Sequence, residues 1–325
     1  MQYGMVSRFV TGDDLPAMCE SAPPFVLLHY VNYGYQSRGV PFRLLGSLRK
    51  MRTHSPGRFI TVFHELYASG PPWRSAFWLR PLQRRIAQSI ARLSESCVLT
   101  SGTARDQLYS LAPAVPLVVQ PVSSGFGEPL LSPERISQKD PHHWLICGGT
   151  ALLEKSVRSF RQVLPLLPDA FAPRQLSVVG GTDNPVVRAL LRDMPNVKWS
   201  YHPRIGAAEA SQIMAGCSCA WLDYFHTAAA PVDALFKSSV FAALGAHGVI
   251  PVFPHETKPL VFEEDRVPGL FFVDLGKAWL PEPEARATIG CQMYDWYHRR
   301  ASLRQLTRVV AKLLGLGARP ALTSS

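Results

Sequence analysis

Two glycine pairs, Gly148-Gly149 and Gly180-Gly181, could bind an anion because each directly follows a short apolar run. In open α/β sheets, ligands bind at the carboxyl ends of strands, where glycine lets the backbone approach a phosphate. Thr150 opens a helical pattern after the first pair, and Lys155 lies within it. A helix N-terminus and an ammonium group both favour a diphosphate. Each glycine pair alone is also typical of an ordinary turn at the end of a strand.

Lys237 and Ser238 form a second candidate anion site, just before an apolar helical run from Val240 to Ala246. Lysine and serine at a helix start offer hydrogen-bond donors to an anion. The alternative is that Asp233 or Ser238 simply caps the helix, which is the more common arrangement.

His64 and Glu65 follow a β-rich run and are the candidate catalytic residues. A histidine at a strand end can act on a leaving phosphate or a sugar hydroxyl, because its unperturbed pKa lies close to physiological pH. A lone histidine is more often a structural residue, and that interpretation stays open here.

The net charge of +10 is concentrated in one part of the chain. The segment 36–92 carries eleven Lys and Arg residues against a single acid, Glu65. A localised basic field attracts a polyanion, such as a membrane surface, a lipid phosphate or a nucleic acid. No known RNA-binding or DNA-binding motif accompanies the charge, which disfavours nucleic acid.

The stretch 71–85 mixes large aromatic residues with arginines. This composition suits the interfacial plane of a membrane, with rings at the headgroups and arginines on phosphates. A core helix with a solvated basic face explains the same pattern equally well.

The elements that must position these residues alternate between short apolar strands and longer helical patterns. The apolar runs do not alternate strictly with polar residues, which is typical of parallel strands buried on both faces of a sheet. The alternation of strands with helices predicts right-handed βαβ units. The predicted strands are 25–30, 58–64, 96–100, 117–120, 143–147, 175–179, 197–200, 219–223, 249–253 and 270–273. The predicted helices are 40–51, 75–95, 103–111, 156–167, 185–194, 207–215, 233–246, 286–299 and 302–314.

A chain of 325 residues favours two domains, and a Pro/Ser/Gly-rich run is the best linker candidate. We therefore predict an α/β protein with two Rossmann-like domains facing each other across a cleft. The expected boundaries are 1–125 for the N-terminal domain, 126–142 for the linker, 143–300 for the C-terminal domain, and 301–325 for a C-terminal helix and tail.

No window supplies the roughly 18 apolar residues of a membrane span, and the N-terminus lacks a secretory pattern. We therefore expect a cytoplasmic protein. The six cysteines have no zinc-binding spacing, and Cys97, Cys147 and Cys219 lie in apolar runs typical of core positions. No metal site is expected.

Taken together, these motifs resemble the bacterial family 4 glycosyltransferases of GT-B fold, over most of the chain. The likeness lies in the stretches 29–41, 63–67, 148–155, 178–181 and 237–252. It implies transfer of a sugar from a nucleotide-diphosphate donor to a glycan or lipid-linked acceptor, usually with retention and without a cofactor or obligatory metal. Polysaccharide or glycoconjugate synthesis at the cell surface would be the setting.

The resemblance also implies roles for single residues. Gly148, Gly149 and Lys155 would hold the donor diphosphate, with Gly181, Lys237 and Ser238 completing the donor site. His64 would contact the transferred sugar. The acceptor would lie near Tyr33, Gly34, Tyr35 and Arg38.

The chain departs from the family pattern at three places. The arginine that often precedes the family's phosphate lysine is absent, and Thr150 and Ala151 stand in that stretch. The usual pair of glutamates eight positions apart is missing, with Leu235 and Ala243 in their places. The glycine-rich first strand and loop is not evident before Met5, which predicts a shortened N-terminal domain. These departures motivate an alternative: a catalytically degenerate GT-B protein that binds a sugar nucleotide or serves as a scaffold subunit.

Overall fold

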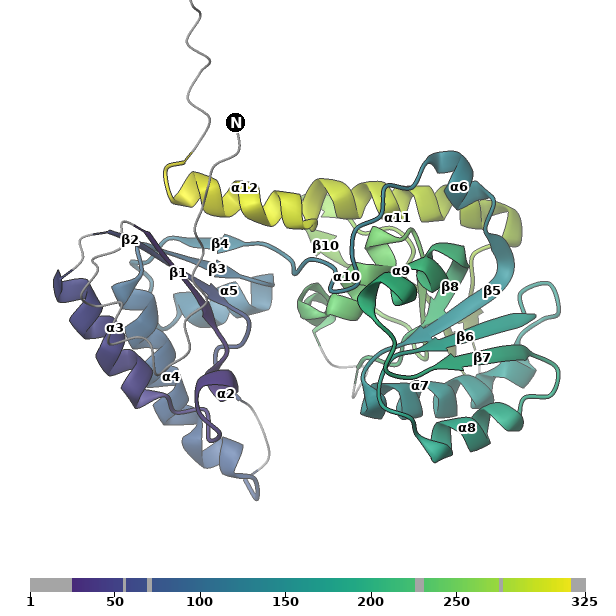
Figure 1. Cartoon of the computed structure of the whole chain (residues 1–325), viewed down its shortest axis with the longest axis horizontal. Coiled ribbons are helices and arrows are strands. Elements are labelled where there is room, and N and C mark those ends of the chain that lie inside the picture. The colour runs from purple at the N-terminus through teal and green to yellow at the C-terminus, as the bar shows by residue number, and fades with distance from the viewer. Residues whose placement is uncertain (1–24, 55–56, 69–71, 226–230, 275–276, 317–325) are drawn as a thin grey trace, which may run out of the picture. The chain divides into compact units, whose positions relative to one another are not determined.

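The computed structural model describes residues 25–54, 57–68, 72–225, 231–274 and 277–316. The chain divides into two compact units (Figure 1). Unit 1 contains the described residues up to Gln120 together with those from Arg308 onward, and unit 2 contains Pro121–Thr307. The chain therefore passes from unit 1 to unit 2 and back again.

Unit 1 is built on a parallel sheet of four strands in the order β1-β2-β3-β4. The strands are β1 (Phe25–Tyr30), β2 (Arg58–Phe63), β3 (Ser96–Leu99) and β4 (Leu117–Val119), and the helices are α2 (Asn32–Tyr35), α3 (Phe42–His54), α4 (Ser75–Leu93) and α5 (Gly102–Tyr109). Phe59 and Phe63 of β2 point to one face of the sheet, into a core shared with α3 and α4. Ile60 and Val62 point to the opposite face, as the two-residue period of a strand requires.

The end of the chain covers that opposite face. The last turns of α12 (Leu303–Leu313) pack Val310 and Leu313, with Leu314, against Ile60 and Val62. Arg58 donates a hydrogen bond from Nη1 to the carbonyl oxygen of Leu313 at 3.0 Å. The end of α12 is thus part of the core of unit 1.

Unit 2 is built on a sheet of seven strands in the order β13-β12-β9-β8-β5-β6-β7. The strands are β5 (Asp140–Cys147), β6 (Gln175–Val179), β7 (Lys198–His202), β8 (Cys217–Trp221), β9 (Ile250–Phe253), β12 (Phe271–Asp274) and β13 (Lys277–Trp279). All are parallel except β13, which runs antiparallel to β12. The strands β10 (Val261–Phe262) and β11 (Asp265–Arg266) form a separate two-stranded ladder.

The α-helices of unit 2 are α6 (Pro133–Ser137), α7 (Thr150–Val163), α8 (Pro185–Arg192), α9 (Ala207–Gly216), α10 (Ser239–Ala246) and α11 (Arg286–Arg300), with 3-10 helices at η1 (Leu164–Leu166), η2 (Val232–Lys237) and η3 (Pro283–Ala285). The chain order reverses at β5. β6 and β7 extend the sheet on one side of it, and β8, β9 and β12 extend it on the other. The carboxyl ends of β5 and β8 therefore form a topological switch point, where open α/β sheets bind ligands.

The ten predicted strands are confirmed to within a few residues, and the α/β class with two parallel sheets is confirmed with them. The boundaries differ from expectation in two places. The stretch 126–142, expected as a linker, lies inside unit 2 and contains α6 and the start of β5. The expected C-terminal helix and tail does not stand apart from the domains, because its described residues from Arg308 belong to unit 1.

The predicted single helix 233–246 is wrong. The chain forms η2, breaks at Ser238 and restarts as α10. Ser238 has extended backbone angles, and its Oγ accepts a hydrogen bond from the Phe241 amide at 3.2 Å. This N-cap ends the preceding turn and starts a new helix.

Candidate functional site

The two glycine pairs lie next to each other at the carboxyl ends of β5 and β6. Gly180 and Gly181 have φ angles of +105° and +62°. A Cβ atom on Gly180 would lie 2.5 Å from the carbonyl oxygen of Gly148, and one on Gly181 would lie 2.9 Å from the Cα of Thr150. Gly180 and Gly181 are therefore required for the close approach of the loops that follow β5 and β6. For these two glycines, the structure supports the alternative of a turn at the end of a strand.

Gly149 differs from the other three glycines because open space surrounds the position of its missing Cβ. It is the N-cap residue of α7, and no side chain caps the helix there. The first amide groups of a helix lack acceptors within the helix, and together with the helix dipole they attract an anion. The start of α7 thus offers backbone donors beside the switch point.

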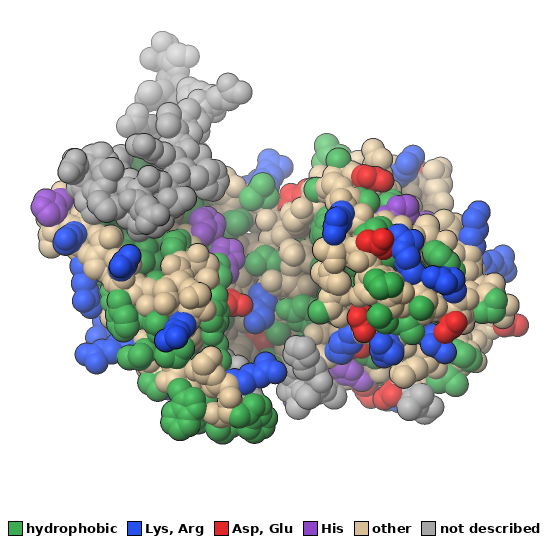
Figure 2. All heavy atoms as spheres, turned by 60° about the horizontal axis from the view of Figure 1, so that its bottom comes forward, with side chains coloured by type: hydrophobic (Ala, Val, Ile, Leu, Met, Phe, Trp, Pro, Cys, Tyr) green, Lys and Arg blue, Asp and Glu red, His purple; other side chains and the backbone are tan. Residues whose placement is uncertain are grey.

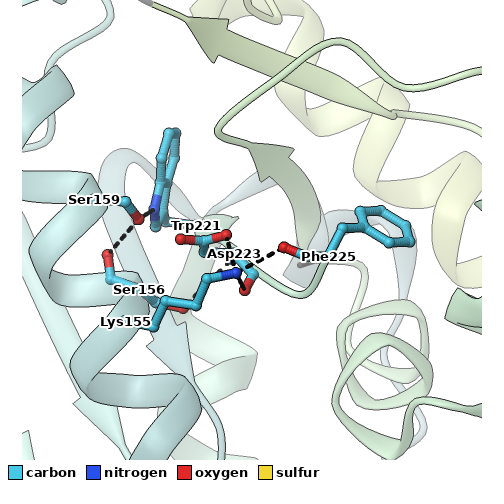
Figure 3. Close-up of polar contacts among 6 residues, drawn as sticks. All are labelled: Lys155, Ser156, Ser159, Trp221, Asp223 and Phe225. Carbon is cyan, nitrogen blue, oxygen red and sulfur yellow. Dashed lines mark hydrogen bonds and ion pairs between the residues drawn. The ribbon is translucent and has the colours of Figure 1, made fainter. Parts of the chain in front are cut away.

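Lys155 extends from α7 to the end of β8 and contacts Asp223 (Figure 3). Its Nζ lies 2.8 Å from Asp223 Oδ1. Nζ also donates to the carbonyl oxygens of Asp223 at 3.2 Å and Phe225 at 2.6 Å. An ammonium group has three donors, and here each has an acceptor within the chain. A phosphate oxygen would have to replace at least one of them.

Asp223 is buried and held in place from α7 as well. Its backbone amide donates to Ser156 Oγ at 3.3 Å, one residue beyond Lys155. Trp221, the last residue of β8, donates from its indole nitrogen to Ser159 Oγ at 3.0 Å (Figure 3). These contacts tie α7 to the end of β8 and place Lys155 at the switch point.

Lys237 and Ser238 lie at the start of α10, which connects β8 to β9. A helix that joins two parallel strands begins at their carboxyl edge, so both residues belong to the same edge as Lys155. Ser238 is buried and its hydroxyl caps α10. Lys237 is exposed. The capping interpretation therefore describes Ser238, while Lys237 is exposed at this edge.

In unit 1, the carboxyl ends of β1 and β2 bring His29 and His64 together. His29 Nδ1 and His64 Nε2 lie 3.1 Å apart, and the two rings stack with their centroids 5.4 Å apart. Burial lowers the pKa of both imidazoles, and the neighbouring His29 lowers the pKa of His64 further. Because one nitrogen must donate to the other, the neutral pair presents one outer nitrogen as a donor and the other as an acceptor. Glu65, the next residue, is exposed.

The residues that the sequence analysis expected on the acceptor side lie in the short segment that follows β1. Tyr35 donates from its hydroxyl to the carbonyl oxygen of His29 at 2.8 Å. Gln83 of α4 is fully buried, and its Nε2 donates to the carbonyl oxygen of Arg38 at 3.2 Å and to Tyr33 Oη at 3.4 Å. The sequence analysis missed Gln83, although a glutamine among the apolar positions of an amphipathic helix is a signal that could have identified it.

Gln83 also fixes the segment that carries His64. Its Oε1 accepts a hydrogen bond from the Ala68 amide at 2.8 Å. Gly39, with φ of +67°, leaves room for this side chain, because a Cβ there would lie 2.7 Å from Gln83 Nε2. The structure thus connects the candidate acceptor and catalytic segments of unit 1, and separately gathers the donor-side candidates of unit 2.

Other features of the described residues lie outside these sites. A cavity of about 410 Å³ in unit 2 is lined by Lys258, Arg266 and Trp279 among others, and it includes none of the predicted site residues. Within the described ranges, no three or more His, Cys, Asp or Glu side chains are grouped so that they could hold a metal ion. No helix in those ranges combines the length and apolar character needed to span a membrane.

Comparison with solved structures shows which fold this is. No protein-family model matches the chain, and no curated protein sequence matches it significantly. An alpha-glucosyltransferase in complex with UDP and a 13-mer DNA is 11% identical, with a TM-score of 0.57, 94% of this chain covered and 84% of that chain.

Two further solved structures give similar values. A UDP-forming trehalose-phosphate synthase from Burkholderia xenovorans is 10% identical, with a TM-score of 0.55 and coverage of 95% of this chain and 78% of that one. The lipopolysaccharide outer core galactosyltransferase WaaB is 11% identical, with a TM-score of 0.51 and coverage of 94% and 78%. At this level of identity the likeness concerns the fold, and the chain accordingly has the GT-B glycosyltransferase fold, with two Rossmann-like units.

Proposed function

We propose that this chain is a glycosyltransferase that moves a sugar, a hexose or a related one, from a nucleoside-diphosphate donor. The observation that carries the proposal is the start of α7. Its uncapped amide groups and the open space at Gly149 follow the carboxyl end of β5, and the ammonium of Lys155 lies at the carboxyl end of β8, the two strand ends that form the switch point. A linked pair of phosphates needs this combination of backbone donors and positive charge.

The reaction we propose is electrostatic in character. Negative charge builds on the leaving diphosphate as the sugar becomes oxocarbenium-like. Lys155, Lys237 and the first amides of α7, with Gly148, Gly149, Gly181 and Ser238 around them, stabilise that charge. The resemblance to bacterial family 4 supports retention of configuration and independence of a metal or other cofactor. UDP is the first nucleotide to test, because similar solved structures contain UDP or UDP-glucose.

Unit 1 supplies the acceptor side in this proposal. His64, with Glu65 beside it, acts at the transferred sugar, and the hydrogen bond to His29 couples the tautomers of the two rings. Tyr33, Gly34, Tyr35 and Arg38 contact a glycan or lipid-linked acceptor in cell-surface polysaccharide or glycoconjugate synthesis. A lipid-linked acceptor would place this cytoplasmic protein peripherally at the inner face of a membrane, with the basic segment 36–92 toward it.

Thermal unfolding with UDP, GDP and ADP tests the donor site. A nucleotide that binds only the native state at a hundredfold excess over its dissociation constant adds about 2.7 kcal/mol of stability. We expect one nucleotide to raise Tm, the Lys155→Ala variant to lose that shift, and Lys198→Ala, an exposed lysine at the amino end of β7, to keep it. If none of the three nucleotides raises Tm in the unaltered chain, the proposal fails.

A second candidate function is sugar-nucleotide binding without turnover. Two observations favour it: the three donors of Lys155 already have acceptors, and Leu235 and Ala243 stand where the family has glutamates. An assay of sugar release from UDP-glucose, GDP-glucose and ADP-glucose, run with and without EDTA, distinguishes the binding protein from the enzyme. Nucleotide-dependent stabilisation with neither transfer nor hydrolysis would establish the binding protein, whereas EDTA-resistant release of the sugar would establish the enzyme.

A further inference from the structure

The start of α4 exposes an unusual amount of aromatic surface. Trp73 is 83% exposed and Trp78 is 70% exposed, with Phe77 and Leu82 also at the surface. Trp78 donates its indole N–H to the carbonyl oxygen of Pro72 at 2.8 Å and packs edge-on against Phe77. Its polar atom is therefore satisfied within the chain, while the rest of the ring faces solvent. Contiguous exposed apolar surface of this kind marks a site of interaction.

The first turn of α3 adds to the same end of unit 1. Phe42, the first residue of α3, is 56% exposed. Both α3 and α4 follow parallel strands and pack against each other, so both begin at the carboxyl edge of the sheet. Figure 2 shows hydrophobic side chains gathered at one end of unit 1, with Lys and Arg side chains close by.

The charge of this surface is positive throughout. Arg74, Arg80, Arg84 and Arg85 are exposed, and within the residues the structure describes none of them forms an ion pair. The first turn of α4 contains no acid, so the positive end of the helix dipole is not compensated there. Arg80 and Arg84 lie over the ring of Tyr67, at 5.4 and 5.6 Å from its centroid.

We propose that the starts of α3 and α4 form a docking surface for an anionic lipid bilayer. Tryptophan and phenylalanine rings enter the interfacial layer, and the arginines bind lipid phosphates. Charge complementarity selects the partner, because an exposed apolar ridge surrounded by unpaired arginines matches a surface that is apolar within and anionic outside. We call residues 42, 73, 74, 77, 78, 82 and 85 the aromatic–arginine surface.

This surface lies on the helix that organises the candidate acceptor segment. Gln83 of α4, one residue after Leu82, binds the backbone of Arg38 and Ala68. A bilayer in contact with α4 would therefore lie next to the segment from Tyr33 to Arg38. Resting on the proposed function, this arrangement identifies the acceptor as lipid-anchored, with its headgroup presented at the membrane surface.

Vesicle co-sedimentation of the full chain tests the surface without any nucleotide. We expect it to bind phosphatidylcholine–phosphatidylglycerol vesicles, to bind pure phosphatidylcholine far less, and to lose binding as salt is added. W73S/W78S should lower the partition coefficient about tenfold, and R74Q/R85Q roughly twenty-fivefold, at about fivefold for each charge removed. Two controls in unit 2, L130S on a 95% exposed leucine and R135Q/R192Q on exposed arginines, should bind as the unaltered chain does.

Equal binding to neutral and anionic vesicles, or unchanged binding of both double variants, would overturn the proposal. So would an oligonucleotide that displaces the vesicles and binds equally well to W73S/W78S, since the surface would then serve nucleic acid. The Tm shift with UDP, GDP and ADP, measured on the same variants, keeps this question apart from the proposed function. If the double variants lose lipid binding and keep the nucleotide-induced Tm shift, the result supports the docking surface. If no nucleotide shifts Tm in any form of the chain, the donor site is rejected and the lipid-binding result is unaffected.

Discussion

Asp223 is a buried carboxylate at the switch point of unit 2, and Lys155 supplies its counter-charge. The pair lies between a surface ion pair and a fully buried one, because the Lys155 side chain is 38% exposed and that of Asp223 is 9% exposed. Removing the lysine alone leaves the carboxylate and two carbonyl oxygens without their donor.

We expect Lys155→Met to lower the free energy of unfolding by about 2 kcal/mol, less than the loss of a fully buried pair because solvent reaches the ammonium. Adding Asp223→Asn to it should restore part of the loss, since no uncompensated charge remains. Denaturant unfolding of both single variants and the double variant measures the coupling. As a control, Arg158→Met breaks the exposed pair with Glu154 and should lower the free energy of unfolding by less than about 1 kcal/mol. Strictly additive effects of Lys155→Met and Asp223→Asn would contradict the pairing of Lys155 with Asp223.

The His29–His64 pair makes the stability of unit 1 depend on pH. Burial lowers the pKa of both imidazoles, and the charge of His29 lowers that of His64 further. The unfolded chain therefore binds more protons than the native one below the ordinary histidine pKa of about 6.5. Stability is fully present above that pH and falls as the pH drops toward the lowered native pKa values.

His29→Gln should raise the pKa of His64 toward its ordinary value, because a neutral amide replaces a ring that can become charged. It should also flatten the decline of Tm between about pH 7 and pH 5. Titration of the His64 ring by NMR measures the first effect, and thermal scans measure the second. His54→Gln, at the exposed end of α3, should change neither the His64 titration nor the slope. A His64 pKa that stays the same or falls in His29→Gln would rule out the pair as the cause.

At the scale of elements, α4 has three roles in unit 1. It packs Ile86 and Ile90 into the core, it holds the segments after β1 and β2 through Gln83, and its start carries exposed aromatic residues. Burying the amide group of a glutamine lowers stability little as long as each of its three hydrogen-bond partners is present. It becomes costly when one side of a hydrogen bond is removed.

Gln83→Met keeps the length of the side chain and removes its hydrogen bonds. We expect it to lower the free energy of unfolding by about 1–3 kcal/mol. Amide hydrogen exchange should become faster in residues 33–40 and 66–68, which lose their anchor. Gln88→Met on the same helix removes a single bond to the carbonyl oxygen of Leu111 and should leave exchange in those two segments unchanged. Equal exchange in the two variants would show that Gln83 does not anchor them.

The sequence predicted elements well where short-range signals decide them. Apolar runs without alternation located the strands, and glycine pairs marked the ends of β5 and β6. Contacts between distant positions were out of reach, because no local pattern encodes them. Lys155 and Asp223 are 68 positions apart, and Gln83 and Arg38 are 45 apart. The helix was predicted to begin at Asp233 because the sequence offered both Asp233 and Ser238 as caps, and only the structure shows that the Ser238 hydroxyl caps α10.

At the scale of the whole molecule, the chain enters unit 2 at Pro121 and returns to unit 1 at Arg308. The return is what completes unit 1. Ile60, Val62 and Val98 form one face of its sheet, and their apolar neighbours there are residues of the chain end, Val309, Val310, Leu313 and Leu314. Without that cover, the face would be an exposed apolar patch on a parallel sheet, which is an arrangement that folded domains avoid.

A chain ending at Thr307 should therefore lose stability in unit 1 and leave unit 2 nearly unchanged. The milder Leu314→Ala should act in the same direction and cost about 2–3 kcal/mol, since it empties a buried position. Hydrogen exchange read separately from β2 and β5 distinguishes the units, and we expect faster exchange in β2 alone. As a control, a chain ending at Leu316 keeps every described contact that the residues from Arg308 onward make with unit 1, and it should behave as the full chain. If the chain ending at Thr307 instead shows faster exchange in β5 than in β2, the residues from Arg308 onward stabilise unit 2, and their packing on the sheet of unit 1 does not stabilise that sheet.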